Sequence, residues 1–192
     1  MRGALRYSLA IDPEDGPMRD EPQLYYLEYY EEFLAKVRLL SRKVLEDGWG
    51  PEFMIGVGRG GLVPAVYISH QLELPMLSID HSSRLPGFAD ELLAKVAAMS
   101  AQGSRLLFVD DINDSGSTIA YIRQLLGDSG CAQENLRFAV LINNTVSNST
   151  VDYWTDEIDR TDDKRWFVFP WESVSTKASI VEEAQSIPER LA

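Results

Sequence analysis

The chain has 192 residues, 45% of them apolar and 25% charged, which allows one domain with a full hydrophobic core but leaves little room for two. The formal net charge of −12 repels a phosphate backbone and so disfavours nucleic-acid binding. No apolar run is long enough to predict a membrane span or a signal peptide, and the single cysteine, Cys131, excludes an intrachain disulfide. We therefore expect a cytoplasmic protein in a reducing compartment.

The first quarter of the chain predicts an irregular arm and then a long helix. Residues 1–23 combine several prolines with mixed charges, which is typical of irregular structure. From Leu24 to Asp47 apolar residues recur three or four positions apart, and Gly48 follows as a stop signal. We expect this helix to pack through one apolar face.

Two strands with a helix between them are predicted next. Phe53 to Val57 is a short apolar run, and Met76 to Ile79 is a second one. The glycine-rich segment 58–61 ends the first run, and a helix is expected over residues 62–72. Pro64 would then lie in the first turn of this helix, where a missing N–H costs little.

The second half of the chain continues this alternation. Residues 81–104 resemble an insertion with a helix over about residues 88–99, and the tail from residue 175 to 191 is expected to be partly helical and peripheral. Further apolar runs predict strands over residues 106–109, 137–142 and 166–169, and the run 151–154 is a weaker candidate.

Short apolar strands that alternate with helices predict an α/β fold, with a parallel twisted sheet covered by helices on both faces. Ligands of such sheets bind at the carboxyl ends of the strands. Segments 58–61 and 110–118 both follow strands, so we expect them to lie side by side at that edge.

Segment 110–118 has the composition of a ligand-binding loop. Asp110 and Asp111 are adjacent carboxylates, which are costly together unless a cation or hydroxyl groups, such as Mg²⁺ or a ribose diol, meet them. The small residues from Asp114 to Thr118 open a helix, where N–H groups and hydroxyls can surround a phosphate. A solvated turn and an ordinary helix cap would use the same residue types, so both readings stay open here. Neither this loop nor segment 58–61 contains a lysine, which excludes a Walker A loop.

The run from Val109 to Thr118 resembles the phosphoribosyl-pyrophosphate (PRPP) motif of type I phosphoribosyltransferases. That motif has apolar residues, two acids, two spacers, an aspartate, a threonine or serine, a glycine, any residue and a threonine, and every informative position matches. Residues 55–65 resemble the pyrophosphate loop of the family and the helix after it. Residues 166–172 resemble the base-binding segment of its xanthine-guanine and hypoxanthine branch.

The resemblance implies a phosphoribosyltransferase domain over residues 24–174 with a small C-terminal base-binding hood, and it leaves residues 1–23 as an arm and residues 175–192 as a tail. The implied reaction joins a purine base to the ribose of PRPP and releases pyrophosphate, with Mg²⁺ as cofactor, in a homodimer or homotetramer. The resemblance also implies a cis peptide bond between Gly58 and Arg59. A mobile loop over the site is implied too, for which residues 81–104 are the candidate.

The resemblance also gives roles to individual residues. Arg59 would stabilise the charge that develops on pyrophosphate, and Asp114 would act as general base toward the attacking base nitrogen. The residues that would hold PRPP are Gly58, Arg59, Gly60, Asp110, Asp111, Asp114, Ser115, Gly116, Ser117 and Thr118. The metal would bind at Asp110, Asp111 and Glu172, although Glu172 has a solvated position as its alternative. The base would contact Asn143, Trp166 and Phe167, whereas Phe169 is expected in the core.

One position departs from the family pattern. The 6-oxopurine branch has a lysine where this chain has Asn143, and an amide can donate to an oxo group or accept from an amino group. Guanine, hypoxanthine, xanthine and other bases therefore stay open as acceptors. A regulatory module that binds PRPP or nucleotides without catalysis is a second hypothesis, which Asp114 disfavours. Transfer to a pyrimidine or a non-nucleobase acceptor is a third, which the segment 166–172 disfavours.

Overall fold

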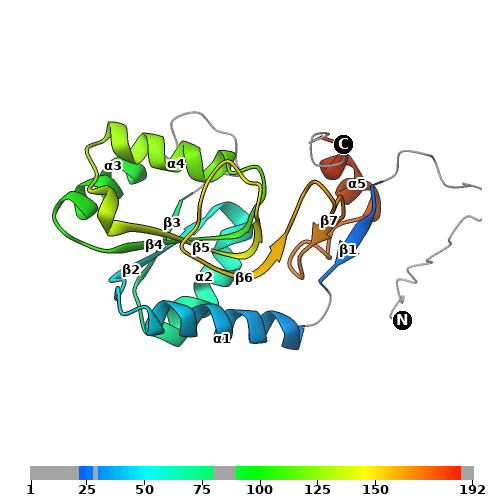
Figure 1. The fold of residues 1–192 in the computed structure, drawn as a ribbon, viewed down its shortest axis with the longest axis horizontal. Helices are drawn as coiled ribbons and strands as arrows, with labels where there is room; N and C mark the ends of the chain where they lie inside the picture. Colours follow the sequence, from blue (N-terminus) through cyan, green and yellow to red (C-terminus); the bar gives the residue numbers. More distant parts are fainter. Residues whose placement is uncertain (1–21, 28–29, 80–89, 187–192) are drawn as a thin grey trace, which may run out of the picture.

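The computed structural model describes residues 22–27, 30–79 and 90–186. A five-stranded parallel sheet with the order β3-β2-β4-β5-β6 forms its centre (Figure 1). The strands are β2 (Phe53–Val57), β3 (Met76–Ile79), β4 (Leu106–Asn113), β5 (Leu136–Asn144) and β6 (Tyr153–Ile158). Because β2 and β4 are neighbours, the glycine-rich and acidic segments that end them meet at one edge of the sheet. The predicted α/β fold is confirmed.

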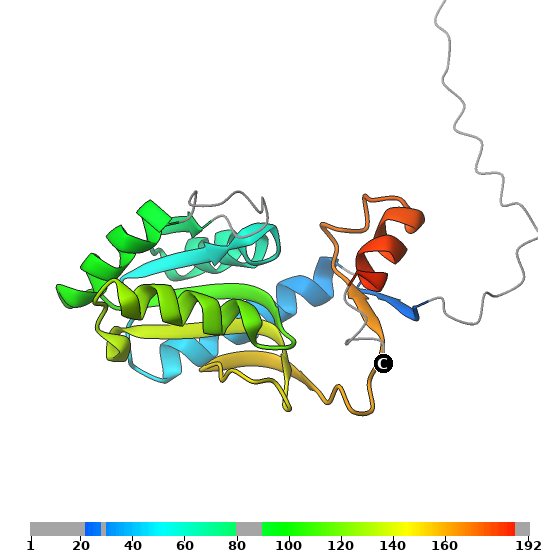
Figure 2. The same ribbon diagram turned by 90° about the horizontal axis from the view of Figure 1, so that it is seen from above.

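Helices cover both faces of the sheet (Figures 1 and 2). One face carries α1 (Tyr30–Glu46) and α2 (Gly58–Leu72), and the other carries α3 (Asp90–Ala101) and α4 (Ser117–Asp128). A short 3-10 helix, η1 (Gln133–Asn135), leads into β5. Strand β4 serves both cores, since Leu107 packs with the α1 and α2 side whereas Phe108 packs with the α3 and α4 side.

A small unit lies to one side of the main sheet in both views (Figures 1 and 2). Strand β1 (Leu24–Tyr26) pairs in parallel with β7 (Trp166–Val168), and α5 (Lys177–Gln185) buries Ile180 and Ala184 against them. The tail that we expected to be peripheral therefore forms part of a core. The division into an arm, a domain and a tail stays a prediction, and residues 1–21 and 187–192 lie outside the described residues.

One predicted strand in this small unit is confirmed, and one predicted helix is too long. The strand expected over residues 166–169 is observed as β7, which pairs with β1 and not with the main sheet, whereas the helix expected over residues 24–47 is observed from Tyr30. Residues 24–26 are apolar and aromatic, which suits a strand, and their backbone pairs with β7 far along the chain. Local periodicity contains no information about such a long-range partner.

Two further predictions need correction. Helix α2 begins at Gly58 without an intervening loop, so Pro64 lies inside the helix and not in its first turn. The helix expected over about residues 88–99 is observed as α3, and it buries Leu93, Val96 and Ala97 in the core, so this part of the candidate mobile loop 81–104 belongs to the packed domain. Residues 80–89 lie outside the described part of the chain. Within the part that is described, no helix combines the length and apolar character that crossing a membrane requires.

Candidate active site

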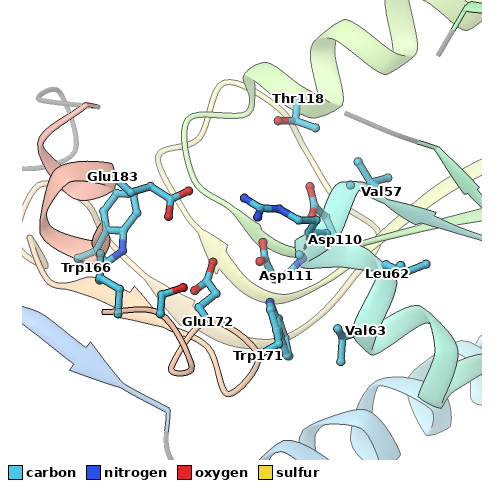
Figure 3. A pocket seen from close by; sticks show the side chains of 15 residues that line it. Val57, Leu62, Val63, Asp110, Asp111, Thr118, Trp166, Trp171, Glu172 and Glu183 are labelled. Atoms are coloured by element: carbon cyan, nitrogen blue, oxygen red, sulfur yellow. Dashed lines mark hydrogen bonds between the residues drawn. The ribbon is translucent and has the colours of Figure 1, made fainter. Parts of the chain in front are cut away.

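Two adjoining cavities lie between the carboxyl ends of β2 and β4 and the small unit, and Figure 3 shows the larger of them. The larger has a volume of about 470 Å³, a size typical of small-molecule sites, and the smaller about 240 Å³. Gly58, Arg59 and Gly60 line the larger cavity, whereas Asp114, Arg160 and Phe167 line the smaller. Both cavities are lined by Asp110, Asp111, Thr118, Trp166, Glu172 and Glu183.

The glycines of segment 58–61 allow two backbones to approach closely. A β-carbon on Gly60 would lie 2.1 Å from Oδ2 of Asp111, and one on Gly61 would lie 2.1 Å from the carbonyl oxygen of Val109. The two segments therefore lie side by side, as predicted. The expected cis peptide bond at Gly58 is wrong: the described residues contain none, and the chain turns there through a positive φ of 56°.

Asp110 and Asp111 lie in the second half of strand β4, where both are half-buried and line both cavities. The N–H of Asp111 donates to Oδ1 of Asp110 at 3.0 Å, and the N–H of Ile112 donates to Oδ1 of Asp111 at 2.7 Å. Among the described residues no three acidic, histidine or cysteine side chains converge closely enough to hold a metal alone. Mg²⁺ typically binds one or two carboxylates together with substrate phosphates, so this carboxylate pair beside a cavity large enough for a small-molecule ligand fits the ion.

The segment 114–118 comprises the turn between β4 and α4 and the first two residues of α4. Its N-cap is Gly116, with a φ of 84°, which offers no side chain to cap the helix, so an ordinary side-chain cap is not what the structure shows. The hydroxyls of Ser115 and Ser117 lie 2.9 Å apart on the exposed side of the turn. Of the residues predicted to hold phosphate in this turn, Thr118 lines both cavities, whereas Ser115, Gly116 and Ser117 are not among the lining residues.

A second loop, residues 147–149, contacts this turn and lines neither cavity. The Ser149 hydroxyl donates to the carbonyl oxygen of Gly116 at 2.8 Å, and the N–H of Asn148 donates to the carbonyl oxygen of Ser115 at 3.2 Å. A β-carbon on Gly116 would lie 2.5 Å from the nitrogen of Ser149, so the two loops are in direct backbone contact. The conformation of the turn is thus fixed from outside the cavity.

Asn143, predicted to contact the base, has a different neighbour. Its Oδ1 accepts a hydrogen bond of 2.8 Å from Nδ2 of Asn113, which is 2% exposed. Asn113 also donates to the carbonyl oxygen of Ser149 at 2.8 Å and accepts from the Ser147 hydroxyl at 2.9 Å. Asn143 lines neither cavity, and its amide oxygen instead bonds to Asn113, the residue that contacts the second loop.

Asp114 is paired with an arginine that the sequence analysis missed. Nε and Nη2 of Arg160 donate to Oδ1 and Oδ2 of Asp114 at 2.8 and 2.9 Å, and the two side chains are 11% and 4% exposed. Nη1 of Arg160 donates to the carbonyl oxygens of Asp163 and Arg165. The predicted strand 151–154 stopped short of this site. The observed β6 runs to Ile158, which brings Arg160 to the carboxyl edge that carries Asp114.

Asn144, buried at the end of β5, connects the two partners of this ion pair. Its Nδ2 donates to the carbonyl oxygen of Asp114 at 2.9 Å, and its Oδ1 accepts the N–H of Arg160 at 3.1 Å. The pair is therefore held through its backbone as well as through its side chains.

Aromatic side chains from the small unit form the far wall. Figure 3 shows Trp166 on the opposite side of the larger cavity from Asp110, and Phe167 lines the smaller one. The guanidinium carbon of Arg160 lies 5.2 Å from the centre of the Phe167 ring. Phe169 is buried and stacks on Trp171 with 4.9 Å between ring centres, so its predicted core position is confirmed.

Glu172 is half-buried and lines both cavities. Burial raises the pKa of its carboxyl to about 7, and the charges of Asp111 and Glu183 add to this rise. The N–H of Phe169, which donates to Oε2 of Glu172 at 2.9 Å, opposes it by lowering the pKa. A carboxylate so placed gains from a nearby cation.

Glu172→Gln is expected to stabilise the metal-free protein at pH 8 but not at pH 4. The folded-state pKa of about 7 exceeds the ordinary value of 4.5, so stability is lost as the pH rises from 4.5 to 7 and the buried group ionises. The glutamine removes this loss. Urea unfolding in EDTA at several pH values measures the free energy of unfolding of the variant and the wild type, with the exposed Glu182→Gln as control. The same difference in free energy between variant and wild type at pH 4 and pH 8 would contradict the expectation.

Comparison with known proteins gives concordant results. A sequence model of the phosphoribosyl transferase domain family matches residues 26–174. The xanthine-guanine phosphoribosyltransferase of Nitratidesulfovibrio vulgaris is 26% identical over 145 residues, which cover 75% of this chain and 82% of that protein. The enzyme of the same name from Cereibacter sphaeroides is 28% identical over 137 residues, covering 66% and 75%. The crystal structure of a purine phosphoribosyltransferase from Pyrococcus horikoshii has a TM-score of 0.58 and 26% identity, covering 77% of this chain and 93% of that one.

Proposed function

The chain belongs to the phosphoribosyl transferase family, and from this membership we propose that it transfers the phosphoribosyl group of PRPP to a purine base. The observation that carries the proposal is the pair of adjoining cavities, which share Asp110, Asp111 and Trp166. A transfer between two substrates needs them side by side in fixed orientation, and two cavities with a common wall meet this need. The similarity to enzymes named for xanthine and guanine supports a purine as acceptor.

PRPP would occupy the larger cavity. Its pyrophosphate would lie at the start of α2, where Gly58 and Gly60 expose backbone N–H groups and Arg59 adds a fixed positive charge. Its 5′-phosphate would lie at the start of α4, where Thr118 lines this cavity and the residues from Ser115 to Ser117 precede it in the chain.

The carboxylates of Asp110 and Asp111 would hold the ribose hydroxyls and Mg²⁺, with Glu172 as a further ligand across the cavity. Bound Mg²⁺ supplies charge stabilisation to the leaving pyrophosphate. Arg59 would contribute to the same stabilisation from the protein side.

The purine base would occupy the smaller cavity. Trp166 would stack on the ring, and the main chain around Phe167 would contact its edge. In the reaction a base nitrogen forms a bond to the anomeric carbon of ribose while the bond from that carbon to pyrophosphate breaks. Asp114 would accept the proton that the nitrogen loses.

Pyrophosphate release from PRPP in the presence of Mg²⁺, across a panel of bases, tests this function. We expect turnover with guanine or hypoxanthine, none with uracil or orotate, and loss of turnover when EDTA removes the metal. Absence of turnover with every base would overturn the enzymatic function.

One observation favours a second candidate, a module that binds PRPP or nucleotides without chemistry. Both oxygens of Asp114 already accept hydrogen bonds from Arg160. Calorimetric binding of PRPP or nucleotides without pyrophosphate release would support this candidate. A homodimer or homotetramer and a cytoplasmic location stay predictions from the family resemblance.

A further inference from the structure

We infer that Arg160 selects the acceptor by donating a hydrogen bond to the exocyclic oxo group of a neutral 6-oxopurine. This inference rests on the proposed function and adds a recognition residue to it. Arg160 lines the smaller cavity together with Asp114, Trp166 and Phe167, the residues among which the base would lie.

The guanidinium of Arg160 is a preorganised donor. It has five N–H groups, and four of them donate to Asp114, Asp163 and Arg165, which leaves one on Nη2 with no partner among the described residues. Its side chain is 11% exposed and lies over the Phe167 ring. A donor that is already fixed loses little conformational freedom when a ligand accepts from it.

Other donors are less suited to this task. The Asn143 amide is bonded to Asn113 and lies outside the cavity. Thr118 belongs to the turn assigned to phosphate. Among the described residues that line the smaller cavity, Arg160 is the one cation.

The charge around Arg160 defines the class of acceptor. Asp114 already compensates its charge, and the cavity is also lined by the carboxylates of Asp110, Asp111, Glu172 and Glu183. An acceptor with its own carboxylate would meet repulsion from these groups. An exocyclic amino group is itself a donor and could not accept a hydrogen bond from Arg160, whereas an oxo group accepts one from the remaining N–H on Nη2. A neutral ring with an oxo group fits best.

Arg160→Gln tests the inference against Arg165→Gln as matched control. Arg165 lies 5.4 Å from the same Phe167 ring but lines neither cavity. We expect wild type and Arg165→Gln to prefer hypoxanthine over adenine in kcat/KM. Arg160→Gln should lower kcat/KM for hypoxanthine about 10- to 100-fold while PRPP affinity stays unchanged, which reduces or abolishes the preference.

Arg160→Lys is a control for misfolding caused by loss of the ion pair, because it keeps a cation beside Asp114 but lacks the forked donor set of arginine. We expect it to lose part of the preference. An unchanged hypoxanthine-to-adenine ratio in the folded variants overturns the inference and leaves the proposed function intact. If the wild type turns over no base, the proposed function fails, and equilibrium binding of IMP and AMP then tests the inference. A preference for IMP that Arg160→Gln removes would support the inference. A wild type without a preference for IMP would overturn it.

Discussion

Asp114→Asn is expected to lower kcat for base transfer by roughly 10²- to 10⁴-fold while PRPP still binds. The carboxylate lines the smaller cavity, at the start of the turn that follows β4, where the base and the ribose carbon would meet. An amide of the same shape keeps hydrogen-bonding capacity but is not a base at neutral pH. Steady-state kinetics combined with PRPP calorimetry separate these two effects.

The ion pair with Arg160 requires a control for this variant, because a buried arginine without its partner is strongly destabilising. The double variant Asp114→Asn/Arg160→Gln replaces the pair with two neutral amides and is expected to fold without recovering turnover. Asp163→Asn, which breaks a neighbouring pair with Arg165 outside the cavities, should retain turnover. Recovery of turnover in the double variant would show that Asp114 serves to neutralise Arg160 and not as a base.

Gly61→Ala is expected to destabilise the fold by about 1–3 kcal/mol or more, the usual cost of overpacking. The added carbon would lie 2.1 Å from the Val109 oxygen and 2.9 Å from the α-carbon of Asp110, both backbone atoms of β4. No side chain can rotate to relieve these contacts, so α2 must move away from the sheet. Urea unfolding measures the loss.

Two glycine variants serve as controls for this prediction. At Gly60 the obstacle is the Asp111 carboxylate, which can rotate, so Gly60→Ala should mainly lower the affinity for PRPP and Mg²⁺. Gly127 lies in α4 with its nearest contact at 3.4 Å, so Gly127→Ala should stabilise by about 0.5–1 kcal/mol. Wild-type stability in Gly61→Ala would contradict the close contact between α2 and β4.

The central strands could be predicted from the sequence because they are buried on both faces and appear as short apolar runs. The run from Leu106 to Val109 forms the buried first half of β4, and the run from Phe53 to Val57 coincides with β2. The polar segments that end β2 and β4 could be assigned to one edge for the same reason, since parallel strands present their carboxyl ends together.

The base side of the site could not be predicted in the same way. Strand β6 lies at the sheet edge and includes Asp156 and Glu157, so its second half lacks an apolar run and Arg160 was not assigned to the edge. The pairing of β1 with β7 and the packing of α5 depend on contacts between the two ends of the chain, which leave no local periodicity. The partner of Asp114 was therefore visible only in three dimensions.

The most direct test of phosphoribosyl transfer is chemical identification of the product. The purified chain, PRPP, Mg²⁺ and hypoxanthine or guanine are incubated together, and the nucleotide and pyrophosphate are quantified by chromatography and mass spectrometry. We expect one nucleoside 5′-monophosphate for each pyrophosphate released. PRPP that stays intact, or pyrophosphate released without a matching nucleotide, would contradict the proposed function.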